Sequence, residues 1–315
     1  MNSTVASTFH LALRALIGCL LASLSVCCHA AIPVRPGDSV WEVSTRHLDG
    51  ASQFGAPLKI SKVIGTSFCP STLDEFLADP VSLTAPQTVV YVHGNWMEWS
   101  NARERGLYVY QLLAAQNCGP IRLILFSWPS QRDGRPGPDV REKAALAHIE
   151  SFYLADFLKN VPNDRPIGMM GFSFGGAVIC GTLQLLAGGT LDCRALPQPI
   201  SPHTNVRVSL VAPAFERNLL SPGGKYQLAL GQIDKLVNLY NSSDPVLKRF
   251  RFIDRGEPVA AGFLGISART SAQLMTDPKI LQFDCTRAAG RTHSEIDYYR
   301  HCPSVKNSLQ NVLGQ

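Results

Sequence analysis

The chain has 315 residues, of which 45% are apolar and 17% charged, and its net charge is +5. This composition excludes a disordered chain and a coiled coil, and it is typical of a globular protein with a large buried core. Positive and negative side chains alternate along the chain without a basic block, which argues against a nucleic-acid partner.

The first thirty residues differ from the rest. Arg14 is the only charged residue before Arg35, and residues 16–26 are apolar or small. A basic start, a short apolar run and a small residue at Ala30 predict a signal peptide over residues 1–30. Its removal would leave one domain over residues 31–315, exported to the periplasm or out of the cell. The alternative is an uncleaved membrane anchor, because Cys28 stands where signal peptides carry a second small residue. A membrane is a partner only in that case.

Nine cysteines occur, three of them before residue 31, which leaves six. An exported chain permits disulfides, although six cysteines allow 15 pairings. Cys285 and Cys302 stand out because they bracket His293, and a bridge between them would restrain that loop. No Cys-x-x-Cys spacing follows residue 30, which argues against a zinc site. We expect no metal and no cofactor.

Taken in chain order, the elements begin with alternating strands and continue with unbroken apolar strands separated by helices. Unbroken apolar runs are typical of strands buried on both faces of a parallel sheet. Strands and helices in alternation predict the α/β class, with a mostly parallel central sheet and helices on both faces. The strands are expected at 39–43, 58–64, 88–92, 121–126, 166–170, 206–212 and 235–240, the helices at 101–116, 140–158 and 174–186, and a connection at 69–87.

A Gly-x-Ser-x-Gly motif, residues 171–175, lies between an expected strand and an expected helix. Its context predicts a sharp strand-to-helix turn that presents Ser173 as a nucleophile, with small neighbours that let the turn close. The helix N-terminus also favours a developing oxyanion. The competing interpretation is a glycine-rich turn with an incidental serine.

The residues His93-Gly94-Asn95-Trp96 follow the strand expected at 88–92. In hydrolases whose serine nucleophile lies at such a strand-to-helix turn, a His-Gly turn points a backbone N–H at the substrate carbonyl oxygen. We therefore expect an oxyanion hole formed by the N–H of Phe174 and that of Asn95 or Trp96. His93 precedes the serine and is interpreted as a structural hydrogen-bonding residue.

The acid and the base are expected later in the chain. Asp244 follows the strand at 235–240, where catalytic groups gather at the carboxyl ends of parallel strands. Asp254 is the substitute, because Asp-Pro is also an ordinary turn signal. His293 is the expected base, with His301 as its rival. The order Ser173, Asp244, His293 is the one expected for a triad on this fold.

These motifs resemble the α/β-hydrolase superfamily, and within it an uncharacterised bacterial branch of lipase- and esterase-like proteins. The resemblance spans residues 88–312. It departs from that branch at Asn95-Trp96 and in the longer loop over 285–302. It implies a serine hydrolase that cleaves a carboxylic ester, with a small-molecule or lipid ester as substrate.

The sequence leaves the reaction and the residues of the substrate pocket open. Thioester or amide hydrolysis and acyl transfer would use the same triad, and an exported binding or surface protein without activity is a different class. Trp96, Trp99, Phe172 and Phe174 are candidates for an acyl pocket, or simply core residues. Residues 214–232 and 248–278 are the expected lids. Nothing in the sequence indicates the oligomeric state.

Overall fold

A computed structural model describes residues 33–48, 55–85, 88–197, 203–253, 256–267 and 279–315. The expected signal peptide lies outside these residues. In the described part of the chain, no helix is both long enough and apolar enough to cross a bilayer.

A nine-stranded sheet forms the centre of the domain over residues 32–315, in the order β3-β2-β1-β5-β4-β6-β7-β8-β9. From β1 onward all neighbouring strands are parallel, whereas β2 and β3 add an antiparallel edge. The mostly parallel sheet predicted from the apolar runs is thus confirmed. The strands are β1 (Ser39–Ser44), β2 (Lys59–Ile64), β3 (Ser67–Ser71), β4 (Thr88–Val92), β5 (Arg122–Ser127), β6 (Ile167–Phe172), β7 (Val206–Val211), β8 (Ile233–Tyr240) and β9 (Ile280–Asp284).

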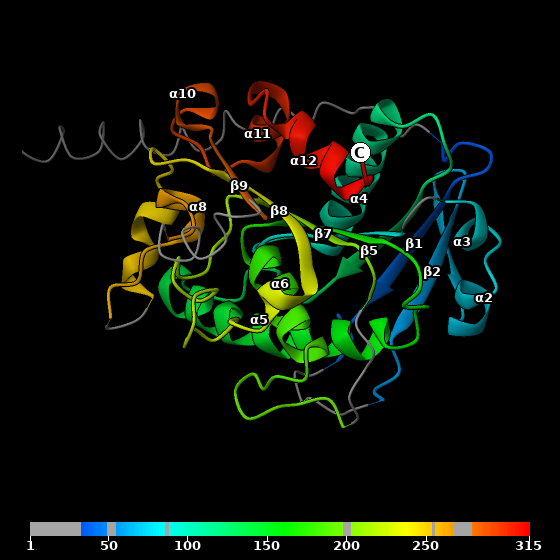
Figure 1. Ribbon diagram of the computed structural model, residues 1–315, viewed down its shortest axis with the longest axis horizontal. Helices are drawn as coiled ribbons and strands as arrows, with labels where there is room; N and C mark the ends of the chain where they lie inside the picture. Colours follow the sequence, from blue (N-terminus) through cyan, green and yellow to red (C-terminus); the bar gives the residue numbers. More distant parts are fainter. Residues whose placement is uncertain (1–32, 49–54, 86–87, 198–202, 254–255, 268–278) are drawn as a thin grey trace, which may run out of the picture. The chain divides into compact units, whose positions relative to one another are not determined.

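Helices cover both faces of the sheet, as expected for parallel strands that are buried throughout. Figure 1 shows α5 and α6 on one face, and α4, α11 and α12 on the other. The helices are α2 (Leu73–Leu77), α3 (Val81–Thr84), α4 (Trp99–Gln116), α5 (Pro136–Leu158), α6 (Phe174–Leu186), α7 (Ala229–Gln232), the 3₁₀ helix η1 (Leu247–Phe252), α8 (Ala261–Leu264), α10 (Thr286–Ala289), α11 (Glu295–His301) and α12 (Val305–Val312).

The segment at 69–87 is not the plain connection that its Pro, Ser and Asp residues suggested. It contains the end of β3 and the helices α2 and α3. Partial exposure hid β3 from the pattern, because an antiparallel edge strand has no continuous apolar run. The Thr72 hydroxyl begins α2 by accepting a hydrogen bond from the Glu75 N–H at 3.2 Å.

The strand order reverses around β4, which lies between β5 and β6. Ligands bind at such reversals, outside the carboxyl ends of the strands. The register pairs Val92 at the end of β4 with Gly171 near the end of β6. The turn after β4 and the turn after β6 therefore emerge side by side at this edge of the sheet.

Candidate active site

Ser173 occupies the turn between β6 and α6 in a backbone conformation that few non-glycine residues adopt, with φ 52° and ψ −121°. Its N–H donates to the Val211 carbonyl at 3.0 Å, and its carbonyl accepts from the Ala214 N–H at 3.0 Å. Two hydrogen bonds to the end of β7 thus hold the strained turn that the Gly-x-Ser-x-Gly motif predicted.

Glycine is required where α6 passes close to the strands. A Cβ on Gly175 would lie 2.1 Å from the Val92 carbonyl oxygen, and one on Gly171 would lie 2.7 Å from the backbone of Gly175. These approaches explain two of the three fixed positions of the motif. The third position is Ser173 itself, only 4% exposed.

Ser173, His293 and Asp244, which lie on three separate segments, are brought together in one hydrogen-bonded chain. The Ser173 Oγ lies 3.0 Å from the His293 Nε2, and the His293 Nδ1 lies 2.6 Å from the Asp244 Oδ2. A carboxylate oxygen only accepts, which assigns the proton to Nδ1 and leaves Nε2 to accept from the serine hydroxyl. This is the geometry of a serine, a base and an orienting acid.

Asp244 is fully buried after β8, and its two carboxylate oxygens have different partners. Oδ1 accepts the backbone N–H groups of Val246 and Leu247 at 2.9 and 3.0 Å. Oδ2 is left facing His293. One oxygen of Asp244 thus stabilises the Asp-Pro turn, and the other orients the His293 ring. Asp254, the expected substitute, lies outside the described residues.

The loop carrying His293 is fastened along its length. Cys285 and Cys302 form a disulfide, the pair that stood out in the sequence. The Asn241 Nδ2 donates to the Gly290 carbonyl at 2.8 Å, which joins this loop to the segment bearing Asp244. His301, the rival base, is exposed in the last turn of α11 and has no described contact with Ser173.

The turn after β4 lies against the serine. A Cβ added at Gly94 would lie 3.1 Å from the Ser173 Cβ, and Trp96 has a positive φ of 56°. Phe174 is the first residue of α6, where a backbone N–H has no acceptor within the helix. The N–H groups proposed for an oxyanion hole thus belong to two turns that meet at the Ser173 side chain.

His93 has a structural role in this turn. Its Nε2 accepts the Trp128 N–H at 3.2 Å, which leaves Nδ1 to donate to the Gly94 carbonyl at 2.9 Å. Burial, with the positive charge of Arg46 adding to it, lowers the pKa of His93 to about 3. The imidazole is therefore neutral at physiological pH.

Arg46, the second residue after β1, was not found from the sequence motifs. Its guanidinium donates to the Met97 carbonyl at 2.9 Å and to the Ser127 hydroxyl at 2.8 Å, and it lies 3.3 Å from the His93 Nε2. It thereby ties the turn after β4 to the end of β5. A charged residue at the end of a fully buried strand was the signal that could have revealed it.

The four aromatic candidates for an acyl pocket do not share one environment. Phe172 packs on the His293 ring with centroids 5.1 Å apart, and Phe174 is buried beside the serine. Trp96 is 41% exposed and its indole N–H donates to Asp139, whereas Trp99 stacks against Arg103.

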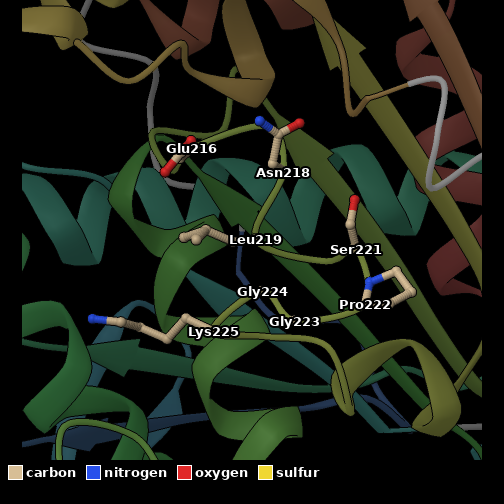
Figure 2. Close-up of a pocket in the computed structure, with 8 residues that line it drawn as sticks. All are labelled: Glu216, Asn218, Leu219, Ser221, Pro222, Gly223, Gly224 and Lys225. Atoms are coloured by element: carbon tan, nitrogen blue, oxygen red, sulfur yellow. The ribbon is translucent and has the colours of Figure 1, made fainter. Parts of the chain in front are cut away.

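A cavity of about 540 Å³ lies in the segment that follows β7. Figure 2 shows that this one stretch of chain supplies its polar and glycine-rich lining. The cavity falls within the predicted lid over 214–232, a segment that starts at the hydrogen bond from Ala214 to Ser173. The lining residues are Glu216, Asn218, Leu219, Ser221, Pro222, Gly223, Gly224 and Lys225. Within the described residues, no cluster of His, Cys, Asp and Glu could hold a metal ion.

No curated protein matches the chain. Among solved structures, an acyl-protein thioesterase 2 of Zea mays is 15% identical, with a TM-score of 0.38 over 72% of this chain and 95% of its own. The thioesterase domain NocB of the nocardicin cluster is 15% identical, with a TM-score of 0.37 over 74% and 96%. The esterase Est2 of Thermogutta terrifontis is 12% identical, with a TM-score of 0.31 over 75% and 83%.

The model of the alpha/beta hydrolase family matches residues 89–300, which is more than half of the chain. This stretch begins in β4 and includes the turn of Ser173, the segment of Asp244 and the loop of His293. With this match and the parallel sheet described above, the chain belongs to the alpha/beta hydrolase family.

Proposed function

We propose that this protein hydrolyses carboxylic esters through an acyl-enzyme formed on Ser173. The observation that carries the proposal is the relay of 3.0 and 2.6 Å hydrogen bonds from Ser173 through His293 to the buried Asp244. Such a relay is the arrangement that activates a serine hydroxyl for nucleophilic attack.

In the acylation step, the Ser173 Oγ attacks the ester carbonyl while His293 takes the hydroxyl proton at Nε2. The imidazolium then gives that proton to the departing alkoxide, which leaves as an alcohol. Asp244 holds the ring and stabilises its positive charge. In deacylation, His293 takes a proton from the water that attacks the acyl-serine carbonyl. It then gives that proton to the Ser173 Oγ as the acyl bond breaks, which releases the carboxylic acid and restores the serine hydroxyl.

The tetrahedral intermediates place a negative charge on the former carbonyl oxygen. The backbone N–H of Phe174 and that of Asn95 or Trp96 are the donors that we assign to this oxygen. Removal of one such donor typically costs about 3–4 kcal/mol of transition-state stabilisation. His93 supports this assignment, because its hydrogen bonds to the Gly94 carbonyl and the Trp128 N–H hold the turn that carries Asn95 and Trp96.

The experiment is a pre-steady-state assay with p-nitrophenyl acetate. We expect a burst of p-nitrophenolate equal to the enzyme concentration, and an acetyl group on the peptide of Ser173 by mass spectrometry. Ser173→Ala should abolish both, whereas His301→Ala should leave both unchanged. A folded wild type without burst, turnover or adduct would contradict the proposal and favour the alternative of a binding protein with a hydrolase fold. Longer p-nitrophenyl esters, thioesters and anilides then sort lipid, small-molecule, thioester and amide substrates.

We also propose that the protein is exported after removal of residues 1–30. The Cys285–Cys302 disulfide supports this, because disulfides persist mainly in oxidising compartments. The intact mass of the protein purified from cell fractions tests the proposal. A mass corresponding to residues 31–315 outside the cytoplasm is expected. A full-length chain in the membrane fraction would indicate the uncleaved anchor.

A further inference from the structure

A buried carboxylate lies two residues after His293. Glu295, the first residue of α11, is 1% exposed. Both of its oxygens accept from the Tyr91 hydroxyl at 3.0 Å, and Oε1 accepts from the Tyr299 hydroxyl at 2.6 Å. Oε2 pairs with the Arg105 guanidinium at 2.7 Å. We call these four residues the Glu295 cluster.

The members of the Glu295 cluster come from separate elements. Tyr91 belongs to β4, Arg105 to α4, and Glu295 and Tyr299 to α11. Tyr91 also lies two residues before His93, where the turn assigned to the oxyanion hole begins. The cluster therefore fixes the position of the histidine loop relative to the strand that presents the oxyanion turn.

The charges of the cluster match this fastening. Burial, and then the charge of Glu295, raises the pKa of both Tyr91 and Tyr299 well above 10, so both phenols are protonated donors. Burial alone would lower the pKa of Arg105, but Glu295 together with Tyr91 and Tyr299 outweighs it, and the pKa is raised. The carboxylate is thus compensated by one cation and two hydroxyl donors, as a buried charge requires.

The loop has two further fastenings. The Cys285–Cys302 disulfide joins the residue before α10 to the residue after α11, and the Asn241 Nδ2 donates to the Gly290 carbonyl on the Asp244 side of the site. Only Ser294 separates His293 from Glu295, so a change at the cluster is transmitted to the imidazole through a short stretch of backbone. A shift of about 1 Å in a catalytic group can cost roughly 100-fold in rate.

We propose that Glu295 is a positioning residue, which sets the distance between the His293 imidazole and the Ser173 hydroxyl by fastening α11 to β4 and α4. The kinetic consequence rests on the proposed esterase function. Glu295 acts through His293 and does not touch the substrate.

The test compares Glu295→Gln with Asp79→Asn. Asp79 is a matched control, because it is also a buried carboxylate (2% exposed), accepts from the Trp41 indole at 2.9 Å and faces the Arg122 guanidinium at 3.6 Å. Arg122 begins β5, so this control lies at the amino-terminal edge of the sheet, away from Ser173. We expect kcat to fall about 10-fold to 100-fold in Glu295→Gln with KM nearly unchanged. In Asp79→Asn, kcat should stay at the wild-type value even if both variants melt at a lower temperature.

Tyr299→Phe keeps the ring and removes one donor, and it serves if Glu295→Gln does not fold. Loss of this hydrogen bond to a charged group should loosen the cluster and lower kcat about threefold or more. A folded Glu295→Gln or Tyr299→Phe variant with wild-type kcat would overturn the inference.

A second readout does not depend on hydrolysis. The proton on the His293 Nδ1, hydrogen-bonded to Asp244, should give a downfield NMR resonance that disappears in His293→Gln. In Glu295→Gln this resonance should move or broaden, and in Asp79→Asn it should not. An unmoved resonance in Glu295→Gln overturns the positioning role. Absence of turnover in the wild type overturns only the esterase proposal, because the resonance still reports on the position of His293.

Discussion

At the scale of single residues, the site depends on side chains whose hydrogen-bond partners fix their orientation. Asp244 accepts two backbone N–H groups and one imidazole N–H, so its charge is held in a fixed position without solvent. The His293 ring is held between this carboxylate and Ser173. His93, by contrast, is held neutral because burial, and then the positive charge of Arg46, lowers its pKa to about 3.

Asp244→Asn should lower kcat by about 10³–10⁴ with little effect on KM, because an amide no longer enforces the productive histidine tautomer. Steady-state kinetics with p-nitrophenyl acetate measure this. His301→Ala is the control and should retain full activity. A fall in kcat in His301→Ala as large as that in His293→Ala would show that His293 is wrongly assigned as the base.

The sequence predicted the residues of the relay because each has a local signature. Ser173 lies in a glycine-framed turn, and Asp244 follows an apolar strand. His293 was expected as the base and His301 was its rival, because both lie between Cys285 and Cys302 and neither has a motif of its own. Arg46 and Glu295 escaped notice because their partners are distant in the chain, and only the folded topology brings them to the site.

At the scale of elements, close packing of α6 on β4 determines where the serine turn lies. The apolar run of α6 and its small residues made the helix predictable from the sequence. The alternating residues at 58–64 also predicted β2, but the edge strand β3 was missed, because its half-exposed residues give no unbroken apolar run. α11 was also missed, since Glu295 and Tyr299 look like surface residues until their buried partners are known.

Gly175→Ala should destabilise the protein severely, because the new Cβ would lie 2.1 Å from the Val92 carbonyl oxygen. Gly231→Ala is the control in α7, where a Cβ meets nothing within 4 Å. That change should be neutral or stabilising by about 0.4–1 kcal/mol. Urea unfolding of the two variants measures the difference. Equal stabilities would show that α6 does not need this approach to β4.

The Cys285–Cys302 disulfide should stabilise the folded protein, because it restricts the conformations of the unfolded chain around His293. It joins residues 17 positions apart, and closure of a loop of about this length is worth roughly 3 kcal/mol. The double variant Cys285→Ala/Cys302→Ala should lose about this much in urea unfolding. Reduction of the disulfide in the wild type should lower the free energy of unfolding by a similar amount. Cys180 is buried and is therefore unsuitable as a control position. Cys118→Ser, at an exposed cysteine, should leave stability unchanged.

At the scale of the whole molecule, two buried titrating groups give stability a dependence on pH. Burial raises the pKa of Glu150 to about 8 from an ordinary 4.5, despite the Thr45 hydroxyl bond. Its contribution to stability is complete below about pH 4.5 and is lost as the pH rises through 8. His93 works in the opposite sense. With a folded pKa of about 3, its contribution is present above pH 6.5 and is lost as the pH falls toward 3.

Between pH 6.5 and 8.5, therefore, Glu150 acts and His93 does not. The free energy of unfolding of Glu150→Gln relative to the wild type should increase steadily over this window. Urea unfolding at several pH values measures both proteins, and subtraction removes the titrations that they share. A difference that does not change with pH would mean that Glu150 is ionised throughout in the folded protein.

The fold class and the central parallel sheet followed from the alternation of apolar strands and helices, and the family match agrees with both. Substrate choice did not follow, because the segment after β7 and the cavity it lines have no periodic pattern to interpret.

The central claim is that His293, oriented by Asp244, activates Ser173. Labelling with a fluorophosphonate probe tests it most directly, because the probe reacts with an activated serine whatever the natural substrate. We expect the folded wild type and His301→Ala to be labelled, and Ser173→Ala and His293→Ala to be unlabelled. Labelling that persists in His293→Ala, or a well-folded wild type that does not react, would contradict the account.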